Sequence, residues 1–268
     1  MAKTIPMIIT NNSILIKDKE SGEFKTFTMP ALIETPNIPF YHQFAEKIAE
    51  CQYYFKEFMK TIYGKKLSKY IFAIIVPDDT SRLESIFINE FFVNSDTCKA
   101  VAQMPMALAL QKDENKYVSI SKSSRNIVVE YVRNHESVVT KYYDMTTADP
   151  NVIMADAAKL HIDLEYESVP VFINNFNMNM DEYLSFGNVV TTKQFLDKIA
   201  EIDEVVDIGA MANASSLTML TGNGNSSTDE TAVYISLDEN KKRTNEVIAD
   251  EIENRISDIV EREGAEIA

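Results

Sequence analysis

The fold of this chain is decided by residues 70–80, which read YIFAIIVPDDT. An unbroken apolar run from Tyr70 to Val76, ended by Pro77, is typical of a strand that is buried on both faces. Strands of this kind occupy central positions in parallel sheets, whose two faces are both covered. We therefore expect residues 70–76 to form a central strand with a parallel neighbour.

The polar residues after this run predict the start of a helix. Asp78, Asp79 and Thr80 are N-cap candidates, because short polar side chains accept hydrogen bonds from the first free amides of a helix. Glu84 extends this cap. The alternative is that Asp78 and Asp79 form an acidic functional pair, but the helix dipole also favours acids here and makes capping the preferred interpretation.

The segments around this centre alternate between strand and helix patterns. Before it, strand-like runs within residues 5–29 form a meander, and residues 42–63 show the apolar spacing of an amphipathic helix that ends at Gly64. After it, a helix from Thr80 precedes a short strand near 99–102 and a helix at 106–111. This alternation indicates an α/β fold.

A second meander follows a polar break at 112–115. Its strand-like runs cover residues 117–121, 127–133 and 136–143. The return of the same order predicts two related halves, with lobes at 1–113 and 114–268. The elements expected further along are a helix at 156–164, a strand at 169–173, a capped helix at 193–199, a strand at 204–208 and a terminal amphipathic helix at 245–263.

Composition narrows the classes of function. The chain has 268 residues, a formal net charge of −15 and only 7 glycines. The negative field disfavours nucleic-acid binding, and the scarcity of glycine leaves few backbone turns that could approach a phosphate closely. Cys51 and Cys98 are too far apart for a zinc motif, and no apolar run suggests a membrane span. We expect a cytoplasmic protein without direct membrane insertion.

Two segments offer further candidate sites. The loop 174–181 interleaves Phe176, Met178 and Met180 with polar residues, which suggests a partner surface, although an irregular edge of the fold explains it equally well. The turn at 119–125 is rich in serine and could hold a phosphate, but a plain hairpin is the simpler interpretation.

The order of these elements resembles the superfamily of actin and the heat-shock chaperone ATPases, most closely the bacterial rod-shape actins. The motifs are the strand ending in Pro77, the segment Gln103-Met104-Pro105-Met106-Ala107 and the hairpin at 117–132. The resemblance covers most of 5–145 and, more loosely, 191–240. It implies a two-lobed α/β fold of ribonuclease H-like type, with mixed sheets flanked by helices and a small lid subdomain that is reduced at about 146–190.

The resemblance also implies positions for a nucleotide pocket. They are Asn11, Asn12, Ser119, Ser121, Lys122, Gly209 and Ala210. Here the first turn has neither the Asp nor the Gly of the family, Ser119 stands where the second turn has Asp, and Met104 stands where the family has a water-polarising Glu. These losses would remove magnesium anchoring, backbone approach to phosphate and orientation of the attacking water.

We therefore expect a non-catalytic actin-like protein that acts through protein contacts, as a self-assembling element or an adaptor, and that needs no ATP or magnesium. Its interaction residues would include Phe176, Met178 and Met180. The alternative is a nucleotide-binding actin-like ATPase with atypical phosphate loops. An unrelated α/β enzyme is a further alternative, which the lack of a convergent set of His, Cys and acidic residues disfavours.

Overall fold

Two mixed sheets organise the part of the chain that the computed structural model describes, which is residues 3–29, 35, 37–176, 178–203, 207–208, 211 and 218–221. The chain divides into two units, Met1–Val233 and Tyr234–Ala268, and all described residues belong to the first. Both sheets belong to the first unit. The helix predicted at 245–263 lies outside the described residues, as do Gly209 and Ala210.

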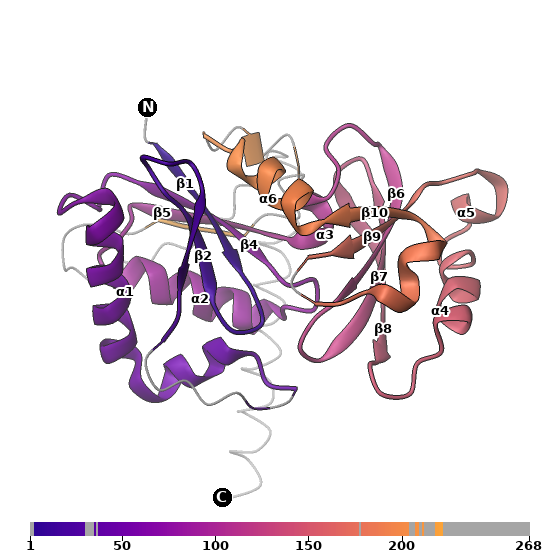
Figure 1. Cartoon of the computed structure of the whole chain (residues 1–268), viewed down its shortest axis with the longest axis horizontal. Coiled ribbons are helices and arrows are strands. Elements are labelled where there is room, and N and C mark those ends of the chain that lie inside the picture. Colours follow the sequence, from indigo (N-terminus) through magenta and orange to yellow (C-terminus); the bar gives the residue numbers. More distant parts are fainter. Residues whose placement is uncertain are drawn as a thin grey trace, which may run out of the picture. The chain divides into compact units, whose positions relative to one another are not determined.

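The first sheet has the strand order β11-β5-β4-β1-β2-β3 (Figure 1). Its strands are β1 (Thr4–Ile9), β2 (Ile14–Lys17), β3 (Phe24–Phe27), β4 (Ile71–Val76), β5 (Ala100–Pro105) and β11 (Thr218–Thr221). Strand β4 lies between β1 and β5 and is parallel to both, while β1, β2 and β3 form an antiparallel meander. The predicted central strand and N-terminal meander are therefore confirmed.

Two helices cover one face of this sheet. The predicted helix at 42–63 is present as a 3₁₀ segment, η1 (Phe40–Lys47), followed by α1 (Ile48–Tyr63), and the second helix is α2 (Arg82–Asn94). Gly64 ends α1 with a φ of 77°, and its amide donates to the Lys60 carbonyl, which is the αL termination that glycine favours.

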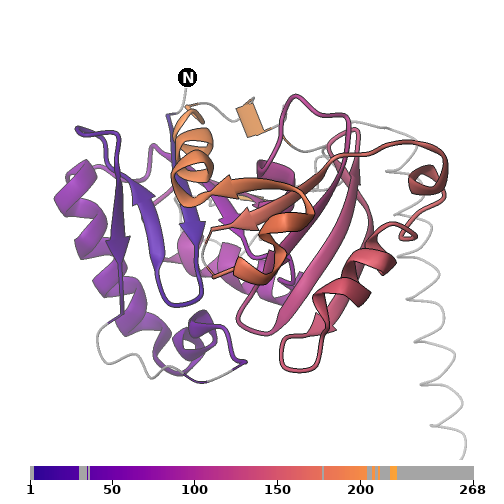
Figure 2. The same cartoon turned by 45° about the vertical axis from the view of Figure 1, so that its right-hand side comes forward.

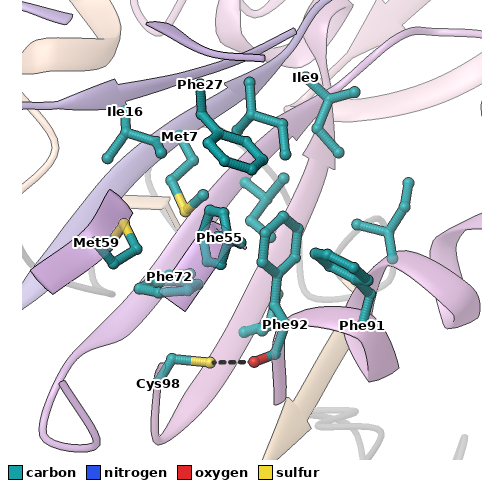
Figure 3. Close-up of a cluster of buried hydrophobic side chains, with 14 of the residues drawn as sticks. Met7, Ile9, Ile16, Phe27, Phe55, Met59, Phe72, Phe91, Phe92 and Cys98 are labelled. Atoms are coloured by element: carbon teal, nitrogen blue, oxygen red, sulfur yellow. Dashed lines mark hydrogen bonds between the residues drawn. The ribbon is translucent and has the colours of Figure 1, made fainter. Parts of the chain in front are cut away.

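The core beneath these helices is aromatic (Figure 3). Phe55 of α1 contacts the rings of Phe72 on β4 and of Phe91 and Phe92 on α2, with ring centroids 5.0–6.2 Å apart. Alternate residues of β4 point to this cluster, and the others, Ala73 and Ile75, point to the opposite face. This alternation explains why the whole strand reads as apolar.

The opposite face packs against α3 (Met106–Ala109), α6 (Thr192–Ala200) and residues of the second sheet. Tyr117 and Phe172 of the second sheet belong to this same buried cluster as Ile75 of β4 and Phe195 of α6. The two sheets therefore share one core.

The second sheet has the strand order β10-β9-β6-β7-β8. Its strands are β6 (Lys116–Lys122), β7 (Asn126–Arg133), β8 (Glu136–Asp144), β9 (Val171–Asn175) and β10 (Asn188–Thr191). Strands β6, β7 and β8 form the predicted second meander, and β9 runs parallel to β6. Helix α4 (Pro150–Ala157) packs on the outer face through Ile153 (Figure 2).

Two predicted elements are wrong in detail. The helix expected at 156–164 is instead α4, which begins at Pro150 after the N-cap Asp149, and a separate short helix α5 (Asp163–Tyr166). Proline at the first helical position sets that start, because it needs no amide partner there. Asp207 and Ile208 are helical rather than part of a strand, and residues 204–206 lie outside the described residues.

The segment predicted as a reduced lid, 146–190, holds α4, α5 and a 3₁₀ segment, η2 (Asp181–Phe186), and it also supplies β9 and part of β10 to the second sheet. The chain passes from the first sheet to the second between β5 and β6, and β11 returns to the first. The lobe boundary at residue 113 and the lid itself remain predictions.

Candidate functional site

The candidate site lies where the loop after β4 meets the β6–β7 hairpin. Helix α2 begins at this point, and its N-cap is Ser81, whose hydroxyl accepts from the Glu84 amide while the Glu84 side chain accepts from the Ser81 amide. This capping box satisfies the helix start. The prediction that Asp78, Asp79 or Thr80 caps the helix is therefore wrong, and the two aspartates are free to bind the hairpin.

Asp79 binds the turn of the β6–β7 hairpin. One of its carboxylate oxygens accepts from the Ser123 hydroxyl at 2.6 Å, from Arg125 Nε at 3.1 Å and from Asn126 Nδ2 at 3.1 Å. The Asp79 side chain is only 3% exposed. The side-chain donors of the turn are thus bound by a carboxylate from the loop after β4.

Arg125 extends this contact to α2. Its two terminal nitrogens donate to the two oxygens of Glu84 at 2.9 and 3.2 Å, and one of them also donates to the Asp79 carbonyl at 2.7 Å. Glu84 accepts in addition from Nε2 of His42 at 2.5 Å. Burial opposes the charge on Glu84, but hydrogen bonds from Ser81, Arg125 and His42 outweigh it and lower its pKa to about 2. Glu84 is therefore ionised at neutral pH.

Asp78 makes the deepest contact between the two sheets. Its carboxylate accepts from the Ala107 amide at the start of α3 at 2.6 Å and from the Ser121 hydroxyl on β6 at 2.5 Å. Burial raises the pKa of Asp78, although the bonds from Ser121 and Ala107 oppose the shift. One carboxylate thus joins the end of β4, helix α3 and strand β6.

Backbone amides of the hairpin turn are satisfied within the turn. The Ser123 hydroxyl oxygen accepts from the amides of Arg125 at 2.9 Å and of Asn126 at 3.0 Å. This is the local hydroxyl-to-amide pattern that serine and threonine form in turns. These are amide donors that a phosphate-binding turn would direct at its ligand.

The β1–β2 turn shows the same device. Thr10 Oγ1 accepts from the amides of Asn12 at 3.4 Å and of Ser13 at 3.1 Å, and it lies 2.8 Å from the Ser13 hydroxyl. In both turns that the resemblance assigns to phosphate binding, backbone amides therefore donate hydrogen bonds to a hydroxyl side chain of the same turn. These hydrogen bonds occupy two backbone amides in each of the two turns.

The remaining predicted pocket residues do not converge. Ser119 and Ser121 point to the inner face of the second sheet and are 1% and 5% exposed. Lys122 alternates to the other face, where its ammonium lies 5.9 Å from the ring centroid of Tyr183. Met104 is 1% exposed and belongs to the shared core.

The loop predicted as an interaction surface, residues 174–181, is largely buried at its apolar positions. Phe176 is 4% exposed and stacks on Phe195 with centroids 4.7 Å apart, and Met180 is fully buried under the second sheet. Only Met178 keeps part of its surface exposed. Phe176 and Met180 are core residues, so the expectation of an exposed apolar surface formed by the three is wrong.

Arg125 and Glu130 are the site residues that sequence reasoning missed. The serine-rich pattern around Arg125 favours a plain hairpin and does not predict the partners of its guanidinium. Glu130 interrupts the apolar strand IVVEYV at residues 127–132, which is the signal that could have found it. It is 2% exposed.

Other kinds of site receive no support from the described residues. Within them, no group of three or more His, Cys, Asp and Glu side chains could hold a metal ion. Cys51 and Cys98 are both buried free thiols, and burial raises the pKa of each. None of the described helices is long and apolar enough to cross a bilayer.

Comparison with known proteins gives neighbours among solved structures only. No protein-family model matches the chain, and no curated protein matches it. An AlfA filament bound to AMPPNP has 11% identity and a TM-score of 0.43, with 75% of this chain and 95% of the AlfA chain covered. The ethanolamine utilization protein EutJ from Carboxydothermus hydrogenoformans has 10% identity and a TM-score of 0.42, with coverages of 74% and 88%.

A third similar structure is MreB5 of Spiroplasma citri bound to ADP, with 12% identity, a TM-score of 0.37 and coverages of 62% and 58%. Because all three TM-scores are below 0.5, none of these similarities bears on what this chain binds or does. The two mixed sheets flanked by helices confirm the predicted α/β class from the chain's own strand order.

Proposed function

We propose that this chain is a non-catalytic actin-like protein that works through protein contacts, as a self-assembling element or an adaptor, without ATP or magnesium. The observation that carries the proposal is that backbone amides of both phosphate-type turns are already hydrogen-bonded to side chains of this chain. The hydroxyl oxygens of Thr10 and Ser123 accept hydrogen bonds from backbone amides of their own turns. The carboxylate of Asp79 accepts hydrogen bonds from side chains of the second turn.

Electrostatics around the β6–β7 turn support the same conclusion. Arg125 is already bound to both Asp79 and Glu84, whose side chains are 3% and 10% exposed. A phosphate placed here would have to displace one of these carboxylates from the guanidinium and then lie beside it. Like charges at short range in a partly buried site oppose that exchange.

The groups that hydrolysis would need are also replaced. Ser119 and Met104 stand at the positions where the resemblance implies an acid that anchors magnesium and an acid that orients water. A hydroxyl and a thioether cannot hold a negative charge at neutral pH, so neither can take over these roles. What remains is a pair of sheets that share an apolar core and are also joined by the chain's own polar contacts.

The nucleotide part of the proposal is tested by isothermal titration calorimetry of the full chain with ATP, with and without magnesium. We expect no measurable heat of binding and no change in melting temperature. Magnesium-dependent binding in the micromolar range would favour the alternative, an actin-like ATPase with atypical loops. A Ser121→Ala variant measured in parallel then shows whether such binding uses the predicted pocket.

The assembly part is tested by sedimentation velocity over a concentration series, again with and without magnesium and ATP. Self-association that is unchanged by nucleotide supports a self-assembling element. Assembly that requires ATP contradicts the non-catalytic proposal. A monomer at every concentration leaves the adaptor role and removes self-assembly.

A further inference from the structure

Glu130 on β7 is a buried acid that the contacts described so far do not use. Its residue is 2% exposed, and its Oε1 has no hydrogen-bond partner among the described residues. The residue directly opposite on β6 is Ser119, which is 1% exposed and whose hydroxyl also has no partner there. An ionised carboxylate with an unsatisfied oxygen is costly in such a place, whereas a neutral acid is far less so.

Strand register places this acid near the contact between the two sheets. Ser119 and Ser121 are two residues apart on β6 and so point to the same face, and Ser119 faces Glu130. Ser121 donates to Asp78, the carboxylate that holds the Ala107 amide. Glu130 therefore lies on the same face of the second sheet as Ser121, whose hydroxyl binds Asp78.

The groups around Glu130 include no compensating cation within the described part of the chain. On β8 the residue opposite Glu130 is Thr140. The carboxylate of Asp78 and the hydroxyl of Ser137 act on the ionisation of Glu130, and its charge acts on the phenols of Tyr117 and Tyr142. The nearby Arg125 is held by Asp79 and Glu84. Burial raises the pKa of Glu130, repulsion from Asp78 raises it further, and the Ser137 hydroxyl only partly opposes the shift.

We propose that Glu130 is a neutral carboxylic acid when the two sheets are in contact, and that its ionisation weakens the bonds of Asp78 to Ala107 and Ser121. The contact is then a pH-dependent latch that loosens as the pH rises. A folded state that holds a proton which the unfolded chain releases loses stability with increasing pH. For Glu130, the loss of stability begins above pH 4.5, the ordinary pKa of the side chain, and continues until the buried acid ionises in the folded protein.

The test is urea unfolding of the full chain between pH 5 and pH 9, with the wild type beside Glu130→Gln. The unfolding constant of the wild type should rise relative to that of E130Q by up to about tenfold per pH unit, the limit for one proton. Asp163→Asn is the matched control and should keep the wild-type slope, because it removes an acid of lowered pKa on α5 that binds Tyr131 and Arg133 of β7. Equal slopes for wild type and E130Q would overturn the proposal.

Hydrogen exchange in the wild type gives a second readout that does not depend on a variant folding. The Ala107 amide, bonded to Asp78, should lose protection with rising pH faster than the Ile74 amide in central β4, after correction for intrinsic exchange. Equal pH dependence of the two amides contradicts the latch. Infrared spectra should also show a protonated carboxyl band that persists above pH 6 and is weaker in E130Q, in which Asp78 still has a raised pKa. Equal bands in the wild type and E130Q overturn the proposal.

Discussion

Replacing Arg125 by alanine should destabilise the fold more than the removal of any exposed cation. The guanidinium binds Asp79 and both oxygens of Glu84, and the side chains of these acids are 3% and 10% exposed. Without Arg125 the two carboxylates stay where they are, with fewer donors to stabilise their charge.

The size of the loss follows from how buried the group is. Breaking a fully buried ion pair costs about 3–5 kcal/mol, and an exposed pair contributes about 0–1 kcal/mol. The Arg125 side chain is 24% exposed, and water entering after its removal can solvate part of the charge on the acids. We therefore expect R125A to lower the free energy of unfolding by roughly 2–3 kcal/mol, between these limits.

Urea unfolding at pH 7 measures this loss. Arg125→Lys should recover only part of the stability, because an ammonium cannot make the bidentate contact with Glu84. Lys141→Ala is the control, since it removes a cation paired with Asp156 on the surface and should cause a much smaller loss. If R125A and K141A are equally stable, the contact between the hairpin and α2 does not hold the two sheets together.

Two further predictions concern the loop and turn after β9. Phe176→Ala should lower the free energy of unfolding by about 3–5 kcal/mol, because the ring is 4% exposed and stacked on Phe195. Met178→Ala, at a partly exposed site, should cause a clearly smaller loss. If thermal unfolding ranks the two variants in the reverse order, this loop is not part of the core. Gly187→Ala should cost about 1–3 kcal/mol, since an added Cβ would lie 2.5 Å from the Val171 carbonyl oxygen. Ser185→Ala, at a neighbouring exposed position, is its control, and equal melting temperatures for the two variants would refute the steric argument.

Local patterns in the sequence were sufficient to predict the main elements of the first sheet. The apolar run at 70–76 predicted β4 as a central parallel strand, because only a strand covered on both faces reads as apolar throughout. The helix ended by Gly64 and the helix capped near Thr191 also follow from residues within one or two turns of each end. Such signals are local, so the tertiary structure did not alter them.

The candidate site depended on contacts that sequence spacing does not encode. Ser81 and Glu84 cap α2, and this freed Asp78 and Asp79 for hydrogen bonds to residues more than 40 positions away. From the sequence alone, all the acids after Pro77 were equally good caps. Only the approach of the hairpin decided which of them binds across the two sheets.

Burial of the loop after β9 was likewise decided by the tertiary structure. Phe176 and Met180 read as apolar residues in a polar loop, and a sequence does not say whether such residues face solvent or the core. The sequence by itself determined the α/β class, the central strand, the end of α1 at Gly64 and the start of α6 at Thr191. The partners of Arg125 and the burial of Glu130 were decided only by the tertiary structure, because both depend on residues that the fold brings together from separate strands and turns.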